Sequence, residues 1–237
     1  MSNLALSFIL GFTAAIASLV GGWLVVQRDW KREVLKYFLA LGSGFMLATA
    51  LLEMVPESVE LAGKNALALV LAGYLLVHFA EHTIVGHFHF GEETHPEEFV
   101  RPRVGDTALV GMLIHTFFDG LAIASGFIVS TWLGALVFLA VFLHKIPDGF
   151  TAASVMLASG RSSRRAIGAV GLMGVATLVG IATMWLLRPQ VAYGLSLSAG
   201  ATIYVAASDL IPEVNRQPGI LMAVWVFVGV ALMLILR

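Results

Sequence analysis

The feature that most constrains this chain is a series of long apolar segments that recurs along its whole length. Each is close to the ~20 residues that a helix needs to cross the hydrocarbon core of a bilayer. Charged residues, Pro and Gly separate eight of them, roughly at 4–26, 35–56, 65–86, 105–128, 130–156, 167–187, 190–212 and 218–236. The sequence therefore predicts an all-α, polytopic membrane protein with one transmembrane domain over residues 1–237.

The composition agrees with lipid as the surrounding solvent. Apolar residues make up 59% of the 237 and charged residues only 12%, and the mean hydropathy is +0.90. A soluble domain carries about twice that charge. The first apolar segment continues to Val26, and no basic residue precedes the signal-peptidase-like Ala15-Ile16-Ala17, so we expect a spanning helix rather than a cleaved signal. A net charge of −1 without a basic block makes nucleic acid an unexpected partner.

Lys and Arg predict the orientation in the membrane. With the N-terminus outside, the inside loops contain Arg28, Lys31, Arg32, Lys36, Arg101, Arg103, Arg161, Arg164, Arg165 and Arg216. The outside then has only Lys64, Arg188 and Arg237, while Lys145 lies within a span. This bias favours both termini outside, in a plasma or inner membrane. We expect residues 87–104 to form a mobile cytoplasmic loop.

Internal repeats are the most informative feature of the sequence. His115, Asp119, Gly120, Ala124 and Ser125 of the fourth span recur as His144, Asp148, Gly149, Ala153 and Ser154 of the fifth, at an offset of 29. A second repeat, at an offset of 156, relates Leu39, Leu41, Gly44, Ala50, Glu53, Pro56 and Glu57 of the second span to Leu195, Leu197, Gly200, Ala206, Asp209, Pro212 and Glu213 of the seventh. Each pair runs in opposite directions, so both predict inverted repeats, which are typical of secondary transporters. For the second repeat, chance similarity between apolar helices is the alternative.

The first repeat contains the residues that could bind a metal. His115 and Asp119 are four residues apart and share one helix face, as do His144 and Asp148 on the next helix. Two facing helices can then surround one point with two imidazoles and two carboxylates, a set that suits Zn²⁺, Fe²⁺, Mn²⁺ or Co²⁺. Cysteine is absent, so no thiolate competes for this role. A single His–Asp pair would favour a structural polar network that joins two helices, but two matching pairs in lipid favour a metal.

Pro147 lies next to this predicted site. It has no N–H to donate to the carbonyl of Leu143, so we expect the fifth span to kink beside His144. A freed carbonyl at this depth is tolerated where it lines a cavity or faces a cation. An ordinary membrane-helix kink is the alternative.

At this point the residues resemble a known family, the ZIP (Zrt-, Irt-like protein) metal transporters. The resemblance covers essentially the whole chain and implies eight helices in a 3+2+3 inverted-repeat bundle. Its paired motifs, H-x-x-x-D/E-G and H-E-x-P-H/E/D, match here at His115 to Gly120 and at His144 to Asp148. The metal ligands that the resemblance implies are His115, Asp119, His144 and Asp148, and the substrate is Zn²⁺, with Fe²⁺, Mn²⁺, Co²⁺ and Cd²⁺ as other candidates.

Two positions depart from the common family pattern. Many members have Asn after the first His and a carboxylate after the second, which gives an adjacent second metal site, whereas this chain has Thr116 and Lys145. The H-K-x-P form resembles the branch that includes the animal Golgi-type members. Because an ammonium repels a second cation, we expect Lys145 to replace the second metal by pairing with Asp119 or Asp148. Snorkelling or a packing role is the alternative.

Further polar residues predict a transport path. Glu53 and Glu57 lie near the outer end of the second span, and Asp209 and Glu213 lie near the inner end of the seventh, with Ser208 as a weaker ligand. A cytoplasmic relay is suggested by His78, Glu81, His82, His87 and His89. The alternative is that these groups are merely solvated at helix ends; Glu53 and Asp209, one turn deeper, are the better candidates for the path.

We therefore expect a carrier that moves a divalent metal towards the cytoplasm and uses no catalytic cofactor. By resemblance, spans one, four, five and six would rock against the other four. An intramembrane zinc hydrolase is one alternative, but it needs a general base, and no H-E-x-x-H is present. A metal-responsive receptor or scaffold is another. Glycines such as Gly168, Gly171 and Gly174 permit close helix contacts, within one chain or in a homodimer.

Overall fold

The computed structural model describes residues 2–27, 33–84, 102–216 and 219–237. Helices account for the regular structure of this part of the chain, and none of it forms a strand. The elements are α1 (Asn3–Val26), α2 (Glu33–Thr49), η1 (Ala50–Met54), α3 (Val55–Ala62), α4 (Asn65–Phe79), η2 (Ala80–Ile84), α5 (Pro102–Val129), α6 (Thr131–Ala158), α7 (Ser163–Leu186), η4 (Arg188–Gln190), α8 (Val191–Tyr204), η5 (Val205–Leu210), α9 (Ile211–Arg216) and α10 (Ile220–Leu236).

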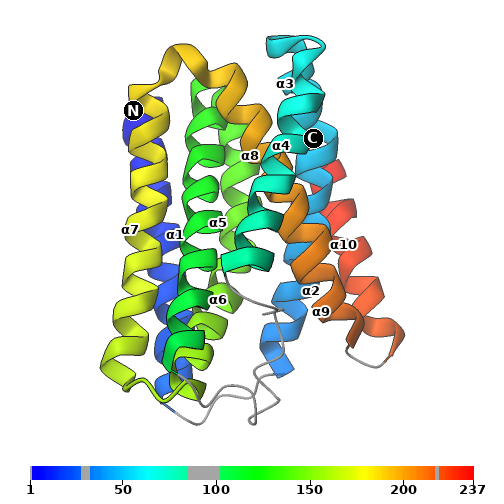
Figure 1. Ribbon diagram of the computed structural model, residues 1–237. Coiled ribbons are helices and arrows are strands. Elements are labelled where there is room, and N and C mark those ends of the chain that lie inside the picture. Colours follow the sequence, from blue (N-terminus) through cyan, green and yellow to red (C-terminus); the bar gives the residue numbers. More distant parts are fainter. Residues whose placement is uncertain (1, 28–32, 85–101, 217–218) are drawn as a thin grey trace.

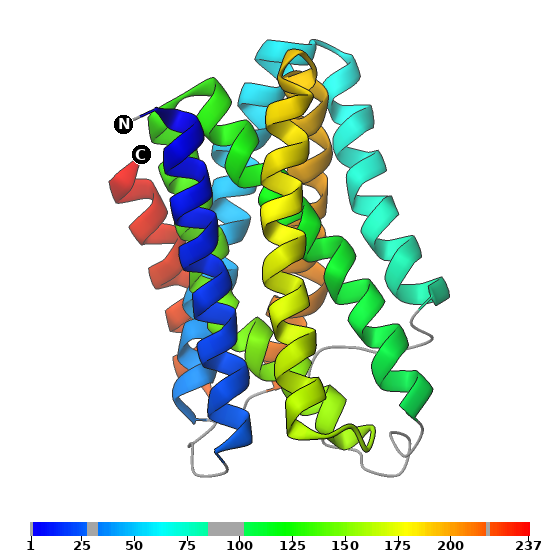
Figure 2. The same ribbon diagram turned by 90° about the vertical axis from the view of Figure 1, so that its left-hand side faces the viewer.

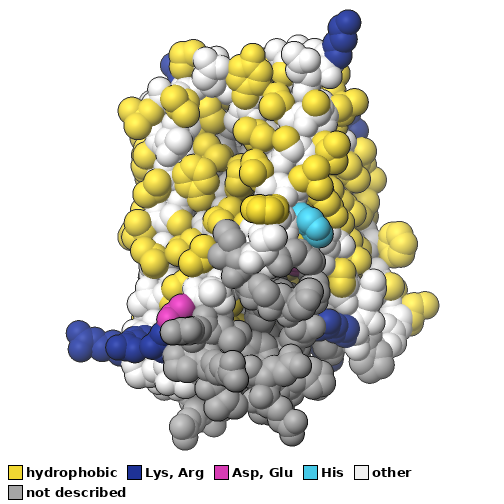
Figure 3. All heavy atoms as spheres, in the orientation of Figure 1, with side chains coloured by type: hydrophobic (Ala, Val, Ile, Leu, Met, Phe, Trp, Pro, Cys, Tyr) yellow, Lys and Arg dark blue, Asp and Glu magenta, His cyan; other side chains and the backbone are white. Residues whose placement is uncertain are grey.

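Because several of these elements continue one another, they form eight helical rods, as the sequence predicted. Six are long and apolar enough to cross a membrane, and α4 and α10 are shorter apolar helices. The rods run side by side, and both termini lie at the same end of the bundle (Figures 1 and 2). Apolar side chains cover most of the face in Figure 3, and the charged side chains visible on it lie near its two ends. The chain is an integral, multi-pass membrane protein.

The rods pack in two groups. In the first, α1 packs on α6 and α7, and α5 packs on α6 and α7; in the second, α2 packs on α10, and α4 packs on α8. The first group lies on the left of Figure 1 and the second on the right. Contacts of α5 with α8 and of α6 with α2 join the two groups. Helices α5 and α6 therefore lie at the boundary between them.

The second and seventh rods extend beyond their predicted ends at 56 and 212. The predicted spans end at Pro56 and Pro212, but helical structure continues to Ala62 and to Arg216. In both rods a π-helical segment, η1 or η5, precedes the proline. A π turn re-routes the backbone hydrogen bonds around the N–H that proline lacks, so the rod continues. The two π segments lie at matching positions of the second repeat, whose two copies are 156 residues apart in the sequence.

Helices α5 and α6 are joined by Ser130 alone. The Ser130 backbone is extended, and its Oγ accepts a hydrogen bond of 3.0 Å from the backbone N–H of Leu133, which caps the start of α6. So short a connection makes α5 and α6 antiparallel neighbours. Consequently the two His–Asp motifs, one near the middle of each helix, come to the same depth.

Candidate metal site

Two imidazoles and two carboxylates meet between α5 and α6. One ligand atom from each of His115, Asp119, His144 and Asp148 lies within 4.8 Å of the other three. His115 Nε2 is 3.2 Å from Asp148 Oδ2 and 3.8 Å from Asp119 Oδ2, and His144 Nε2 is 3.5 Å from Asp119 Oδ2. Zinc ligands about 2.0–2.1 Å from the ion lie roughly 3.4 Å apart at the tetrahedral angle. The four groups therefore need to move little to enclose one ion.

The four side chains are removed from the surface of the bundle. Their exposed fractions are 1% for His115, 3% for Asp119, 0% for His144 and 1% for Asp148. Among the described residues, His115 Nδ1, His144 Nε2 and Asp148 Oδ1 have no hydrogen-bond partner. Buried polar atoms without partners are rare, because each costs desolvation free energy. Of these atoms, His144 Nε2 lies 3.5 Å from Asp119 Oδ2 and so within the cluster, where it is available to a cation.

Helix α6 holds His144 in a state that suits a metal ligand. Its Nδ1 is 3.1 Å from the carbonyl oxygen of Ala140, one turn earlier. A carbonyl can only accept, so Nδ1 carries the proton and donates it, and Nε2 is left with its lone pair towards the site. Pro147 lies inside α6 without ending it. Because Pro147 has no N–H, the carbonyl of Leu143 next to His144 lacks its helical donor. The kink expected at this point stays a prediction.

Lys145 is the only Lys or Arg side chain in contact with the four, as far as the described residues show. It is fully buried, and its Nζ donates to Asp119 Oδ2 at 2.6 Å and to Asp148 Oδ2 at 3.1 Å. A buried ammonium needs such partners, since a lone ion in a low-dielectric medium is strongly destabilised. Lys145 therefore ties together the two carboxylates, one from each helix. By contrast, the hydroxyl of Thr116 donates to the carbonyl of Met112 at 2.5 Å, within its own helix.

The glycine after each aspartate sets the position of its helix. A Cβ on Gly120 would lie 2.0 Å from the carbonyl oxygen of Thr177 on α7, and a Cβ on Gly149 would lie 1.9 Å from that of Ser18 on α1. Contacts this short cannot form, so only glycine permits these backbone approaches. In each Asp-Gly pair, the aspartate side chain therefore faces the site, and the glycine contacts the backbone of a neighbouring helix.

The sequence of this chain matches a known protein family. Residues 2–108 and 97–237 match the family model described as ZIP zinc transporter. The chain belongs to the ZIP zinc transporter family. Members of this family are transporters rather than enzymes, so membership argues against the hydrolase alternative.

Three relatives illustrate the range of similarity. Zinc transporter SLC39A7 of Homo sapiens is 32% identical over 120 residues, which cover 46% of this ZIP chain and 26% of that protein. Zinc transporter ZIP9-B of Xenopus laevis is 23% identical over 87% of this chain and 84% of its own length. Metal cation symporter ZIP14 of Homo sapiens is 22% identical over 85% of this chain and 58% of its own length. The match to SLC39A7 thus spans about a quarter of that relative.

The predicted path residues are not members of the four-residue cluster of this ZIP chain. Towards the end where the chain termini lie, Glu53 in η1 pairs with Arg237, Nε to Oε1 at 2.7 Å, and Glu57 is half-buried in α3. Sequence reasoning missed Arg237 as a partner, because the two residues are far apart in the chain. At the opposite end, Glu213 in α9 pairs with Arg216 at 3.4 Å.

Among the predicted path residues, Asp209 most resembles the four cluster residues, because it too is buried and, as far as the described part of the chain shows, has an unpartnered oxygen. It is 6% exposed in η5, and its Oδ2 has no hydrogen-bond partner among the described residues. Its neighbour Ser208 shares a hydrogen bond of 2.9 Å with the hydroxyl of Tyr74.

Two tyrosines that the sequence did not single out complete this region. The ring centroid of Tyr204 is 5.8 Å from that of His78 and 5.1 Å from that of Tyr74. The side chain of His82, and all of His87 and His89, lie outside the described residues, so most of the predicted relay stays a prediction.

Proposed function

We propose that this chain carries a divalent transition metal, foremost Zn²⁺, across the membrane through the site formed by His115, Asp119, His144 and Asp148. The observation that carries the proposal is the convergence of four buried ligand atoms within 4.8 Å at the boundary between two helix groups. Imidazole and carboxylate ligands suit Zn²⁺ but also Fe²⁺, Mn²⁺, Co²⁺ and Cd²⁺. The printed names of the relatives, two zinc transporters and a metal cation symporter, favour zinc as substrate.

Movement of the two helix groups would expose the site to each side in turn. Helices α1, α5, α6 and α7 would rock against α2, α4, α8 and α10, which is the division in which the helices pack. The ligands come from one group only, so they can stay together while the facing surface changes. Glu53 and Glu57 would attract the ion at the outer side, with both termini outside. Asp209, Ser208 and Glu213 would receive it on the cytoplasmic side, with His78 and Glu81 near the exit.

Lys145 replaces a second metal ion in this proposal. With neutral imidazoles, two aspartates and Lys145 together carry one negative charge, and one Zn²⁺ brings the site to a single positive charge. A site with Glu at this position and two Zn²⁺ ions reaches the same charge. The 2.6 and 3.1 Å contacts of Nζ with both aspartates support this substitution. An ammonium tethered to α6 stays when the metal leaves, so it keeps the carboxylates paired between transport events.

The test of the carrier is metal uptake into liposomes that contain the purified chain. The parent is expected to accumulate Zn²⁺, and His144→Ala to reduce the initial rate by about 100-fold or more, because a ligand is lost from the ion. Ser58→Ala is the matched control, since Ser58 of α3 is equally buried but its hydroxyl donates only to the carbonyl of Met54, one turn earlier. Binding of zinc without accumulation would support a receptor instead.

The test of Lys145 is the number of metal ions bound per chain. Lys145→Glu is expected to raise the bound zinc from one to two, measured by equilibrium dialysis and elemental analysis. If this variant binds no more metal than the parent, Lys145 does not replace a second ion.

A further inference from the structure

A cavity at the end of the first helix group away from the chain termini is lined by charged and apolar residues that the transport site does not use. It has a volume of about 450 Å³ and lies between α5 and α7, with α6 beneath. Its lining residues are Asp106, Leu109, Met156, Arg161, Arg165, Gly168, Ala169 and Leu172. None of them belongs to the metal site or to the path proposed above.

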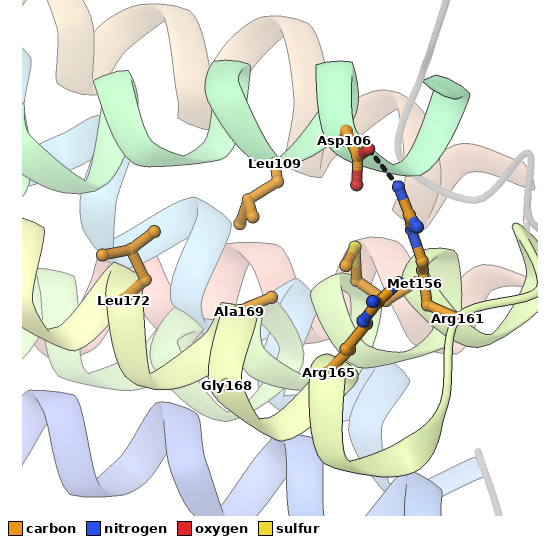
Figure 4. A pocket seen from close by; sticks show the side chains of 8 residues that line it. All are labelled: Asp106, Leu109, Met156, Arg161, Arg165, Gly168, Ala169 and Leu172. Carbon is orange, nitrogen blue, oxygen red and sulfur yellow. Dashed lines mark hydrogen bonds and ion pairs between the residues drawn. The ribbon is translucent and has the colours of Figure 1, made fainter. Parts of the chain in front are cut away.

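The charged groups gather at one end of this cavity. Figure 4 shows Asp106, Arg161 and Arg165 at that end, and Leu109 and Leu172 at the other. The guanidinium of Arg161 pairs with the carboxylate of Asp106. No ion pair to Arg165 is present among the described residues, and its exposed side chain points into the cavity (Figure 4). Two arginines and one aspartate give the lining a net charge of one positive unit.

The apolar part continues from this charged end towards the middle of the bundle. Arg165, Gly168, Ala169 and Leu172 follow the 3–4 spacing of one face of α7, which makes a stripe about 10 Å long. A Cβ on Gly168 would meet nothing within 4 Å, so the space beside it is open, and Leu172 is 47% exposed. The cavity thus opens onto the apolar surface that faces lipid.

We propose that this cavity binds the headgroup of an anionic phospholipid whose phosphodiester carries one negative charge. Arg165 donates to the phosphate, and Arg161, held in place by Asp106, provides the second positive group. One acyl chain starts beside Gly168 and Ala169 and continues over Leu172. Basic pockets between transmembrane helices on the cytoplasmic side are suited to such headgroups. The bound lipid would tie the inner end of α5 to α7.

Two features of the cavity favour a lipid over a free anion: the positive charge at one end and the open apolar side. A soluble phosphate would satisfy the arginines but leave the stripe from Gly168 to Leu172 without an apolar partner. A zwitterionic lipid would fill the stripe, but its own ammonium would face the two guanidinium groups. An anionic phospholipid satisfies both ends.

The test uses the purified full-length chain in neutral detergent, titrated separately with phosphatidylglycerol, phosphatidylcholine and inorganic phosphate. Native mass spectrometry counts the bound lipids, and thermal unfolding follows the stabilisation by each additive. Phosphatidylglycerol is expected to bind at one site and to raise the Tm, while the other two have little effect. A shift of the same size with inorganic phosphate alone, or equal binding of phosphatidylcholine, would overturn the proposal.

Two matched pairs of variants locate the binding. Arg165→Gln is expected to weaken phosphatidylglycerol about fivefold, and Arg164→Gln, which removes a neighbouring arginine outside the cavity, to leave it unchanged. Gly168→Phe should block the apolar groove, whereas Gly171→Phe, at an equally open position that does not line the cavity, should not. Equal effects within either pair would show that the lipid binds to the general surface and not to this site. Each variant is first required to match the parent's Tm without lipid.

Discussion

The segments His115–Gly120 and His144–Gly149 share their histidine, aspartate and glycine on two antiparallel helices, and of the three positions between histidine and aspartate, all of which differ, the first matters most for the site. In both, the histidine and aspartate face one point and the glycine packs against another helix backbone. On α5 the following residue is Thr116, whose hydroxyl bonds within its own helix; on α6 it is Lys145, whose ammonium joins the aspartates of both helices. The repeat therefore provides the shape of the site, and the difference after the histidine provides the positive charge.

The two histidines differ in a second way. His144 donates from Nδ1 to a carbonyl of α6 and so presents a free Nε2 to the site. His115 has its Nε2 3.2 Å from Asp148 and no hydrogen-bond partner for Nδ1 among the described residues. Because a carboxylate accepts, Nε2 of His115 carries the proton here and must lose it when it binds a metal. His144 is therefore already in the protonation state that binds an ion, whereas His115 must first lose its Nε2 proton and its hydrogen bond to Asp148.

The largest expected effect comes from removing the ammonium. Lys145→Met leaves Asp119 and Asp148 buried without their shared partner, so in metal-free detergent the free energy of unfolding is expected to fall by about 3–5 kcal/mol. Zinc should restore much of this loss, because it replaces the missing charge. The double variant Lys145→Met with Asp119→Asn should be less destabilised than the single one. Denaturant titration with and without zinc measures all of these, and equal losses in the single and double variants would contradict the pairing.

The next prediction compares the two histidines directly. His115→Ala and His144→Ala are each expected to lower zinc affinity about 100-fold or more, which corresponds to roughly 2.7 kcal/mol, since each removes one ligand. Isothermal titration calorimetry of both variants, alongside Ser58→Ala, gives the two losses on one scale. Should either variant keep the parent's affinity, the ion would have to be bound by one half of the site alone.

A smaller effect is expected from the glycines behind the site. Gly120→Ala and Gly149→Ala each introduce a methyl group where the opposing carbonyl oxygen is only 2.0 or 1.9 Å away, so each should destabilise the fold by about 1–3 kcal/mol. Gly168→Ala is the control, because its Cβ meets open space and alanine favours the helix by up to about 1 kcal/mol. Thermal unfolding of the three variants compares them. A control that loses as much as the other two would mean that the contacts with the carbonyls of Thr177 and Ser18 are not the cause of the losses.

The smallest effect is predicted at Thr116. Thr116→Val keeps the shape and removes a hydroxyl that bonds only to the carbonyl of Met112, so stability should change by less than about 1 kcal/mol and zinc uptake by less than about twofold. Liposome uptake provides the measurement. A large loss of uptake would make Thr116 a ligand and remove the difference between the two halves.

Some parts of the molecule could be predicted from the sequence and others could not. The helices were predictable, because apolar runs of bilayer length leave little choice, and the two His–Asp pairs were predictable from four-residue spacing and repetition. The continuation of the second and seventh rods beyond Pro56 and Pro212 was missed, since no clear sequence pattern marks a π turn that lets a helix continue past a proline. The partners of Glu53 and of Asp106 were also missed, because Arg237 and Arg161 are distant in the chain.

The sequence by itself determined the helical class, the eight rods and the four residues that meet between α5 and α6, since hydropathy and helical periodicity are local properties of a chain. Only the tertiary structure decided that Lys145 contacts both aspartates, that Gly120 and Gly149 pack against α7 and α1, and that Arg165 points into an apolar groove. These depend on which backbones approach one another, and that is set by the packing of the whole bundle.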